Sequence, residues 1–388
     1  MPVVIDVSKT DDPRDVVHRA VQALAEGKLV AFPTETSYGI AASALQETAV
    51  QRLNHLRKGQ RVSGPALVLR SCDEMLDYAP QLSPLGQRLA RRCWPGPLQL
   101  VVQGVQRDSL AGRLPAAVQA ALADGLTLRV PAHALILSAL RLAVGPLLLC
   151  DVWRGPGEVA ATAADVLSAL GDEVPLVLDD GRTRFAAPAS EVRVVGCEME
   201  VSRPGVLNEA TLLRLASLMV LFVCTGNTCR SPMAEVLMRR RAARRLGCEL
   251  ADLENRGVLI LSAGIAAMAG SAASPEAHDA VSDRGLDLTQ HESQPVTDRL
   301  VRFADLIVTM TRGHRDALLA QWPGAAGRTK LLSRAQSDVA DPIGGPLELY
   351  RRCADQIDSY LEAWEQELAW EELPVLRSSG VTGGSKDS

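Results

Sequence analysis

The sequence of 388 residues has no long uninterrupted apolar run. No stretch reaches the roughly 18 consecutive apolar residues of a membrane-spanning helix, and residues 1–6 lack the charged-then-apolar order of a secretion signal. The eight cysteines are scattered, with no Cys-x-x-Cys pair and no cluster with histidine, which argues against a zinc site. Scattered cysteines are typical of reduced thiols, not of a disulfide framework. We therefore expect a cytoplasmic protein with no membrane segment and no metal.

The charge of the chain is nearly balanced. Its formal net charge is −5, so the whole chain offers no electrostatic case for nucleic acid as its main partner, although local basic patches stay open. Apolar residues make up 47% and charged residues 22%, which is ordinary for a globular protein. A chain of this length can form two domains, each with its own core.

One octapeptide, Cys-Thr-Gly-Asn-Thr-Cys-Arg-Ser at residues 224–231, has the composition of a phosphate-binding loop. It follows an apolar run at 218–223, which predicts a buried parallel strand, and it precedes Pro232, which is typical of the first turn of a helix. A strand, a tight loop and a helix start direct backbone N–H groups at an anion. Cys224 adds a nucleophile and Arg230 a bidentate phosphate ligand. The octapeptide therefore predicts a cysteine-dependent phosphatase loop.

This chemistry also needs a proton donor for the leaving group. Asp341 is the candidate, because Pro342 restricts the loop that presents it; turn formation or helix capping is the alternative role for Asp341. Strands alternate with helices through this half, which predicts a doubly wound, four-stranded parallel sheet. The segments expected as its strands are 218–223, 258–264, 304–310 and 329–332.

The order Cys-x5-Arg-Ser, then Ser-Ala-Gly, then a late Asp-Pro resembles the low-molecular-weight protein phosphatase family over residues 219 to about 370. The resemblance implies that Cys224 forms a phospho-cysteine, that Arg230 binds the phosphoryl group and that Asp341 acts as acid and then as base. It implies no metal and no cofactor. It also gives phosphate-loop or specificity roles to Thr225, Gly226, Asn227, Thr228, Cys229 and Ser231.

Substrate choice in this family is expected to depend on Thr228 and on the residues after Asp341. Phosphotyrosine members often have Ile or Leu at the position of Thr228 and aromatic residues after Asp-Pro. Here Thr228 and the segment Asp-Pro-Ile-Gly-Gly resemble the bacterial protein-arginine phosphatases, so we favour phosphoarginine over phosphotyrosine. Cys229 is expected to pack as a small buried residue. The resemblance implies the alternative, a reversible disulfide with Cys224. An arsenate reductase would need further resolving thiols, and no cysteine lies between Cys248 and Cys353.

The first half contains five short motifs in a recognisable order. They are Lys-Leu-Val-Ala-Phe-Pro-Thr-Glu-Thr-x-Tyr-Gly (28–39), a basic stretch (57–61), Trp-Pro-Gly-Pro (94–97), Arg-Val-Pro-x-His (129–133) and Arg-Pro-Gly (203–205). Together they resemble the YrdC/TsaC family, the threonylcarbamoyl-AMP synthases. The resemblance implies a twisted α/β sheet and a site for ATP with Mg, bicarbonate and L-threonine, which serve tRNA modification.

The resemblance gives nucleotide- or threonine-binding roles to Thr34, Lys58, Arg61, Ser190 and Arg203. Lys58 and Arg61 are spaced one residue too far apart for the family's phosphate motif. A second departure is Asp151 and Trp153, which stand where the family has Ser and Asn.

A carboxylate and an indole near ATP phosphates would oppose binding by charge and by volume. Three interpretations stay open for this half: a degenerate synthase site, a second working enzyme, or a regulatory module that binds nucleotide, tRNA or double-stranded RNA.

The predicted organisation is therefore a YrdC/TsaC-like domain at 1–208, a phosphatase domain at 218–374 and a disordered tail at 375–388. The linker between the domains is short and is not rich in Gly or Ser, so we expect no freely tethered arrangement. Five arginines at positions 239–245 are expected to form a solvated helix face or a docking patch for acidic partners.

Overall fold

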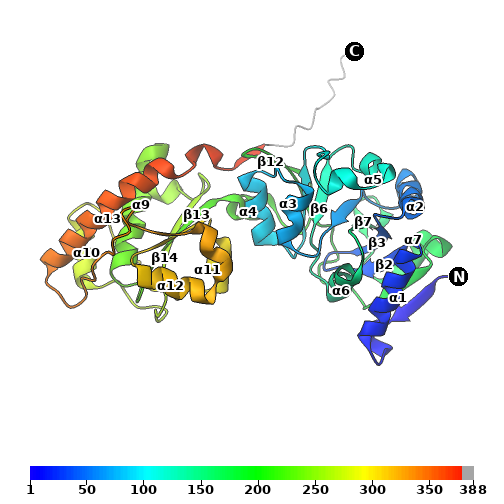
Figure 1. Cartoon of the computed structure of the whole chain (residues 1–388), viewed down its shortest axis with the longest axis horizontal. Helices are drawn as coiled ribbons and strands as arrows, with labels where there is room; N and C mark the ends of the chain where they lie inside the picture. The colour runs from blue at the N-terminus through cyan, green and yellow to red at the C-terminus, as the bar shows by residue number, and fades with distance from the viewer. Residues whose placement is uncertain (378–388) are drawn as a thin grey trace, which may run out of the picture. The chain divides into compact units, whose positions relative to one another are not determined.

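The computed structural model describes residues 1–377 and divides the chain into two compact units (Figure 1). The first unit is Met1–Leu215 together with the segment from Val375, and the second is Ala216–Pro374. The boundary falls in helix α8 (Glu209–Ala216), within the predicted junction. Within residues 1–377, no helix combines the length and the apolar character that a membrane crossing requires.

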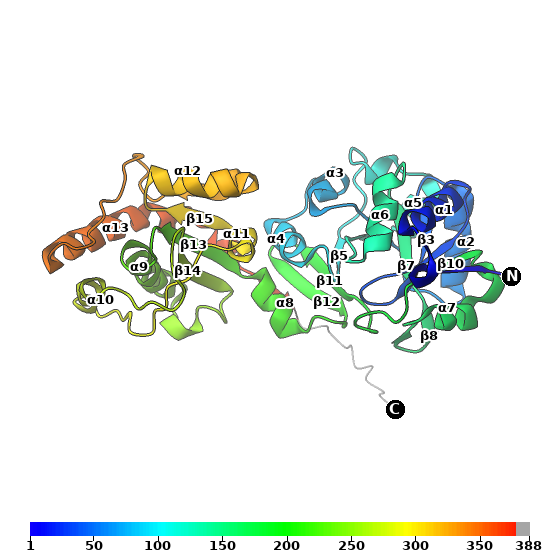
Figure 2. The same cartoon turned by 90° about the horizontal axis from the view of Figure 1, so that it is seen from below.

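The first unit is built on a mixed sheet of eleven strands. In spatial order the strands are β1 (Val3–Asp6), β10 (Leu176–Asp179), β2 (Val30–Pro33), β3 (Tyr38–Ser43), β7 (Leu147–Asp151), β4 (Ala66–Val68), β6 (Leu126–Arg129), β5 (Leu98–Val102), β11 (Ser190–Val195), β12 (Glu198–Arg203) and β17 (Val375–Arg377). Figure 2 shows β5, β11 and β12 side by side. A separate hairpin joins β8 (Trp153–Gly155) to β9 (Glu158–Val159).

Helices connect these strands. They are α1 (Pro13–Ala25), α2 (Glu47–Lys58), α3 (Met75–Tyr78), α4 (Pro84–Cys93), α5 (Ala116–Ala121), α6 (Ala134–Leu142) and α7 (Ala163–Leu170). Helix α1 begins at Pro13, because the Asp12 carboxylate accepts a hydrogen bond from the Arg14 N–H and proline suits the first turn.

A core forms where α1 and α6 cover the sheet. Strand residues two apart point to the same face, so Val30 and Phe32 of β2 and Leu147 and Leu149 of β7 are buried together. This core supports the turn between β2 and β3. In that turn Thr34 donates a hydrogen bond to the Ser37 carbonyl (2.7 Å).

The second unit contains the predicted four-stranded parallel sheet, which confirms that fold class. Its strands in spatial order are β14 (Val258–Gly264), β13 (Leu218–Cys224), β15 (Leu306–Thr309) and β16 (Thr329–Leu331). Its helices are α9 (Arg230–Leu246), α10 (Pro275–Ser282), α11 (Asp298–Phe303), α12 (Arg312–Gln321) and α13 (Leu347–Glu367).

The central strand β13 is apolar on both sides because helices cover both faces of the sheet (Figure 1). Val220 and Phe222 pack with residues of α9, α10 and α13, whereas Leu221 and Val223 pack with residues of α11 and α12. Cys224 ends this strand, and α9 begins at Arg230. The loop between them therefore lies at the carboxyl edge of the sheet, where ligands bind in open α/β folds.

The predicted disordered tail is wrong for its first three residues. Val375–Arg377 form strand β17, which pairs in parallel with β12, and the Val375 N–H donates to the Cys197 carbonyl (2.9 Å). The side chain of Arg377 also forms an ion pair with Glu198. Short strands at a sheet edge are stabilised by such long-range pairing, which local composition does not reveal. The rest of the predicted tail, residues 378–388, lies outside the described residues.

We expect Val375→Pro to weaken the β12 edge. Proline cannot donate the hydrogen bond to Cys197, and Val375 is half-exposed, so little core packing changes. The free energy of unfolding of the first unit should fall by about 1 kcal/mol, and amide exchange in β12 should accelerate. Val375→Thr keeps the N–H and serves as the control. Unchanged exchange in the proline variant would show that β17 does not protect the edge.

Two candidate active sites

The sulfur of Cys224 lies among hydrogen-bonding groups. Its Sγ is 2.9 Å from the Ser231 hydroxyl and accepts a bond from the Asn227 N–H at 3.3 Å. Cys224 itself is buried, at the end of β13. Donors at these distances stabilise a negative sulfur, so the arrangement is suited to a thiolate nucleophile.

Asn227 holds the loop in its shape. Its φ of 55° is in the left-handed region, which costs a residue other than glycine conformational energy. Its side-chain amide donates to Ser231 (3.0 Å) and to Ser262 (2.8 Å), and its side-chain carbonyl accepts from the Gln294 N–H (2.9 Å). The His291 ring nitrogen bonds to its backbone oxygen at 2.7 Å. These bonds compensate for the strained backbone and fix the direction of the loop N–H groups.

The hydrogen-bond network continues below the loop. Ser262 donates to the carboxylate of Glu235 at 2.6 Å, and burial raises the pKa of Glu235. Glu235 belongs to α9 and Ser262 to β14, so the network joins a helix and a strand to the loop. The loop is therefore supported by rigid elements on two sides.

Gly264, the last residue of the Ser-Ala-Gly segment, allows β14 to approach this loop closely. A Cβ at this position would lie 2.5 Å from the Thr225 carbonyl oxygen and 2.9 Å from the Asn227 nitrogen. Both contacts involve backbone atoms, so no side-chain movement relieves them. The sequence pattern singled out this glycine, but its role is visible only from the loop that packs on it.

Arg230 and Asp341 form an ion pair in the second unit. The Arg230 side chain is 6% exposed and the Asp341 side chain 43% exposed. Arg230 also donates to the Val339 carbonyl at 3.3 Å, which anchors the guanidinium. The arginine is thus fixed in the protein while the carboxylate remains at the surface, so an anion that enters the loop competes with Asp341 for Arg230.

The side chain of the loop residue Cys229 lies among hydroxyl groups. Its sulfur is 3.6 Å from the Thr228 hydroxyl, 3.4 Å from that of Ser274 and 3.8 Å from that of Tyr350. Cys353 lies nearby on α13, and burial raises the pKa of its thiol to about 12, which makes it a poor nucleophile. Among the described cysteines all are free thiols, and the proposed pairing of Cys229 with Cys224 stays a prediction.

His314 is a site residue that the sequence did not predict. It belongs to the first turn of α12, and its Nε2 lies 2.8 Å from the Thr225 hydroxyl. Burial, together with the charge of Arg230, lowers the pKa of His314 to about 4. A lone histidine in a helix carries no local signal of this contact, because 89 residues separate it from Thr225.

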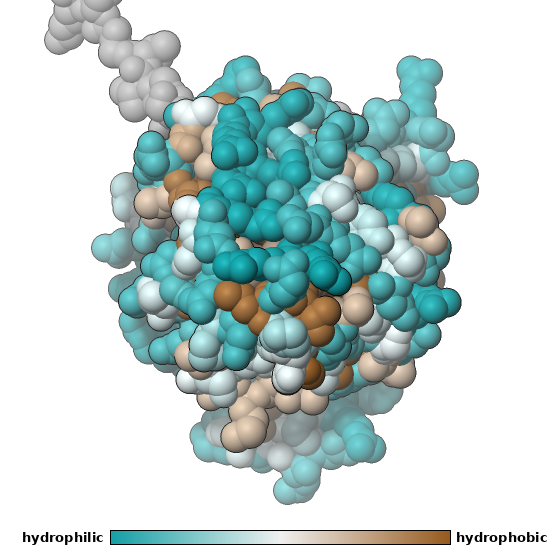
Figure 3. Space-filling view, turned by 90° about the vertical axis from the view of Figure 1, so that its left-hand side faces the viewer, coloured by the Kyte–Doolittle hydropathy of each residue, from teal (hydrophilic) through white to brown (hydrophobic). Residues whose placement is uncertain are grey.

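Exposed apolar side chains follow the segments that surround the loop. Ile343, two residues beyond Asp341, is 68% exposed. Met268 is also exposed, and it lies two residues after Ala266, whose N–H donates to the Thr225 carbonyl. The face drawn in Figure 3 is mainly hydrophilic, with a small hydrophobic patch. The position after Asp-Pro is therefore aliphatic in character and offers no aromatic ring to a substrate.

The arginine-rich stretch of α9 is partly neutralised within the second unit. Arg241 pairs with Asp358 and Glu365 at 2.8 Å each, and Arg240 with Asp358 at 3.4 Å. These acids belong to α13, so part of the stretch holds two helices together. For Arg240 and Arg241, the expectation of a solvated face and its alternative, a docking patch, are therefore both wrong.

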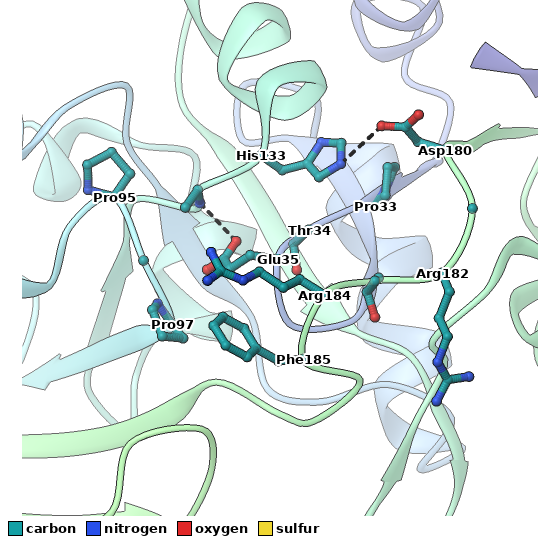
Figure 4. Close-up of a pocket in the computed structure, with 14 residues that line it drawn as sticks. Pro33, Thr34, Glu35, Pro95, Pro97, His133, Asp180, Arg182, Arg184 and Phe185 are labelled. Carbon is teal, nitrogen blue, oxygen red and sulfur yellow. Dashed lines mark hydrogen bonds and ion pairs between the residues drawn. The ribbon is translucent and has the colours of Figure 1, made fainter. Parts of the chain in front are cut away.

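The first unit contains a cavity of about 430 Å³ beside the turn at Thr34 (Figure 4). His133 and Asp180 face each other across one side of it, with 3.3 Å between Nε2 and Oδ2, and burial lowers the pKa of His133. Arg184 extends across the cavity near Glu35, and its guanidinium lies 5.0 Å from the centre of the Phe185 ring. The cavity is large enough for an amino acid and combines polar groups with an apolar wall.

A buried charge network lies next to this cavity. Arg129, which is fully buried, donates to the Glu35 carboxylate at 2.9 Å and lies 3.6 Å from Asp151. Asp151 is also 3.5 Å from Arg203 and accepts a hydrogen bond from Ser37 at 2.9 Å. Glu191 also lies 3.8 Å from Arg203. Two arginines are thus matched by three carboxylates, and the network holds no excess positive charge for a polyphosphate.

The structure does not bring the predicted nucleotide residues together. Thr34 borders the cavity, whereas Lys58 is exposed at the end of α2. Arg61 donates to the Ala169 carbonyl and pairs with Glu173 at 2.6 Å. The two later positions are also engaged, since Ser190 bonds to the backbone of Leu207 and Arg203 to Gln99 (2.8 Å).

The cavity residues that sequence reasoning missed are Glu35, His133, Asp180, Arg184 and Phe185. Glu35 and His133 lie within the motifs at 28–39 and 129–133, so the sequence carries a signal for them. The other three follow β10, and only the pairing of β10 with β2 places them near Thr34.

Comparisons with known proteins agree with the division of the chain into two units. The family model described as "Low molecular weight phosphotyrosine protein phosphatase" matches residues 219–373, and the model described as "Telomere recombination", of the Sua5/YciO/YrdC family, matches residues 22–205. A protein-arginine-phosphatase of Geobacillus stearothermophilus is 33% identical over 157 residues, which are 39% of this chain and 97% of that protein.

Two further relatives each match only one half of the chain. The "Probable low molecular weight protein-tyrosine-phosphatase EpsP" of Ralstonia nicotianae is 33% identical over 42% of this chain and 97% of its own length. A threonylcarbamoyl-AMP synthase of Pyrococcus abyssi is 30% identical over 47% of this chain and 52% of its own length. Each half thus matches a different group of proteins.

We expect Gly264→Ala to disrupt the loop. The added methyl group would overlap the Thr225 carbonyl, so the loop would shift and misplace its N–H groups. Hydrolysis of p-nitrophenyl phosphate should fall by about 100-fold, whereas Gly324→Ala, at a glycine of the second unit with open space around it, should retain activity. Equal activities of the two variants would contradict the role given to Gly264.

We expect Asp341→Asn to tighten the binding of inorganic phosphate by about 2- to 5-fold, because phosphate no longer competes with a carboxylate for Arg230. The measurement is phosphate affinity by calorimetry. Asp338→Asn is the matched control, since Asp338 pairs with Arg312 instead. Weaker or unchanged phosphate binding in Asp341→Asn would refute the competition.

We expect Asp151→Asn to destabilise the first unit by about 3 kcal/mol, because it removes a buried carboxylate that lies against the fully buried Arg129 and the partly exposed Arg203. Denaturant unfolding measures the loss. Asp172→Asn, at an exposed site, should change stability little. A loss below 1 kcal/mol for Asp151→Asn would show that the network is hydrated and weakly coupled.

Proposed function

Because the chain is a fusion of a YrdC/TsaC (threonylcarbamoyl-AMP synthase) family member with a low-molecular-weight protein phosphatase family member, we propose that its second unit hydrolyses phosphorylated side chains of proteins through a phospho-cysteine. The observation that supports this most directly is the Cys224 sulfur at the carboxyl edge of the sheet, bonded to Ser231 and Asn227 and close to a helix start. The reaction needs no metal and no cofactor.

The mechanism has two displacements at phosphorus. The Cys224 sulfur attacks the phosphoryl group, the bond from phosphorus to the leaving atom breaks, and Asp341 donates a proton to that atom. Asp341 then removes a proton from water, which attacks the phospho-cysteine and releases phosphate together with the free thiolate. Arg230 and the loop N–H groups stabilise the charge on the phosphoryl oxygens in both steps. Binding of the substrate dianion to Arg230 releases Asp341 from its ion pair and makes the acid available.

We assign phosphoarginine as the preferred substrate over phosphotyrosine. Thr228 presents a hydroxyl where a larger aliphatic side chain would fill the loop, and Ile343 with two glycines replaces the aromatic pair that would enclose a tyrosine ring. The similarity to an arginine phosphatase and to a tyrosine phosphatase is equal in identity, so these particular residues support the assignment rather than overall similarity.

Thr228→Ile tests the preference. We expect it to lower kcat/KM for a phosphoarginine protein by about 10-fold, since a hydroxyl and the space around it are lost, and to spare phosphotyrosine hydrolysis. Ser271→Ile, which changes an exposed hydroxyl elsewhere, is the control. Equal phosphoarginine hydrolysis by wild type and Thr228→Ile would remove Thr228 from the argument.

For the first unit we propose a degenerate synthase site that retains a binding cavity. The residues present do not fit ATP with Mg, because Glu35, Asp151 and Glu191 already pair with Arg129 and Arg203. Arg61 is likewise engaged with Glu173. The cavity beside Thr34 is preserved and favours a small ligand such as L-threonine. The eight free thiols fit a reducing cytoplasm, which we propose as the location.

Titration of the full chain with ATP and Mg, with L-threonine and with tRNA or double-stranded RNA tests this assignment, together with product analysis in the presence of bicarbonate. We expect threonine binding without threonylcarbamoyl-AMP formation. Turnover at an ordinary enzymatic rate would establish a second working enzyme, and RNA binding alone would identify a regulatory module.

A further inference from the structure

The hydroxyl of Thr225 occupies an unusual position in the phosphate loop. Thr225 directly follows the nucleophile, and it is exposed, whereas its neighbours Cys224 and Asn227 are buried. Its carbonyl is bound to the Ala266 N–H at 3.0 Å, so its backbone is fixed. The hydroxyl has one partner within residues 1–377, the His314 ring at 2.8 Å.

His314 is a rigid partner. The Thr311 hydroxyl caps α12 and accepts the His314 N–H at 3.1 Å, which holds the residue in the first helical turn. The preceding strand β15 pairs with β13 through Thr309 and Val223, so α12 starts beside the phosphate loop. Burial and the neighbouring Arg230 lower the pKa of His314, and its ring is neutral at physiological pH.

The position of the single ring proton follows from hydrogen-bond satisfaction. The Nδ1 atom of His314 is buried and has no hydrogen-bond partner in the described part of the chain. A proton there would be a buried donor without an acceptor, and such donors are rarer in proteins than acceptors without a donor. The proton is therefore favoured on Nε2, where Thr225 accepts it.

We propose that Thr225 contacts the substrate of the phosphatase reaction and that His314 is the positioning residue that turns the Thr225 hydroxyl hydrogen toward the bound phosphoryl group. This inference rests on the proposed phosphatase activity of the second unit. A hydroxyl oxygen that accepts from His314 keeps its own hydrogen free, and Thr225 is exposed, so a bound anion can reach that hydrogen. A dianion in the loop attracts that hydrogen and gains a donor beyond Arg230 and the N–H groups.

Two pairs of variants test the proposal. Thr225→Val removes the hydroxyl and Thr225→Ser keeps it; His314→Leu removes the donor and His314→Gln keeps an N–H near the Nε2 position. We expect Thr225→Val and His314→Leu to weaken inhibition by inorganic phosphate and to lower kcat/KM for p-nitrophenyl phosphate by about 10-fold each. Thr225→Ser and His314→Gln should stay within about 3-fold of wild type.

The double variant separates positioning from mere packing. If His314 acts through Thr225, then Thr225→Val combined with His314→Leu should be no worse than Thr225→Val alone. Multiplying losses would overturn the proposal, and so would unchanged phosphate inhibition in Thr225→Val or a loss in His314→Gln equal to that in His314→Leu. His278→Leu, at a half-exposed histidine outside the loop, is the matched control, and thermal unfolding of every variant identifies a folding defect.

Phosphate binding and phosphate-ester hydrolysis test the Thr225 contact and the phosphatase activity separately. Phosphate binding to the full chain, measured by calorimetry, reports on the Thr225 donor whether or not phosphoarginine is the preferred substrate. A wild-type chain that binds phosphate but hydrolyses neither p-nitrophenyl phosphate nor phosphoarginine would refute the proposed function alone. Wild-type hydrolysis with normal phosphate inhibition in Thr225→Val would refute the inference alone.

Discussion

The left-handed backbone of Asn227 is the constraint on which the phosphatase site depends. Its side chain and carbonyl bond to Ser231, Ser262, Gln294 and His291, which come from α9, from β14 and from the segment that follows α10. These contacts offset the cost of a positive φ and set the N–H groups around the Cys224 sulfur. Loop preorganisation supplies much of the electrostatic stabilisation in phosphoryl transfer, and here it depends on the side-chain amide of Asn227.

The two units use the same kind of ion pair in opposite ways. In the second unit a buried arginine, Arg230, pairs with a carboxylate that reaches the surface, so an incoming dianion can replace it. In the first unit Arg129 and Asp151 are both fully buried, and a second arginine, Arg203, closes the network. Removing one partner from such a network leaves an uncompensated charge, so it resists exchange with a ligand. Asp341 is exposed, so a ligand can displace it from its arginine, whereas Asp151 is buried and stays paired.

Much of the second unit could be predicted because its signals are local. The apolar run before Cys224 and the alternation of strands with helices were sufficient for the parallel sheet. The first unit was predictable as a family but not as a site: Arg61 and Ser190 fit the motif order, yet they bond to other parts of the fold. Spacing along the chain does not report which side chain faces a cavity when a strand pairs with partners distant in sequence.

The amino-acid sequence by itself determined the loop composition and the division into two units, and it was sufficient to propose Cys224 as the nucleophile and Asp341 as the acid, because each depends on residues close together in the chain. Only the tertiary structure decided which partners those residues meet. Arg129 bonds to Glu35 across 94 residues, Ser37 to Asp151 across 114 and Thr225 to His314 across 89. Contacts over such separations arise from sheet pairing and burial, and the charge balance and hydrogen-bond direction at each site follow from them.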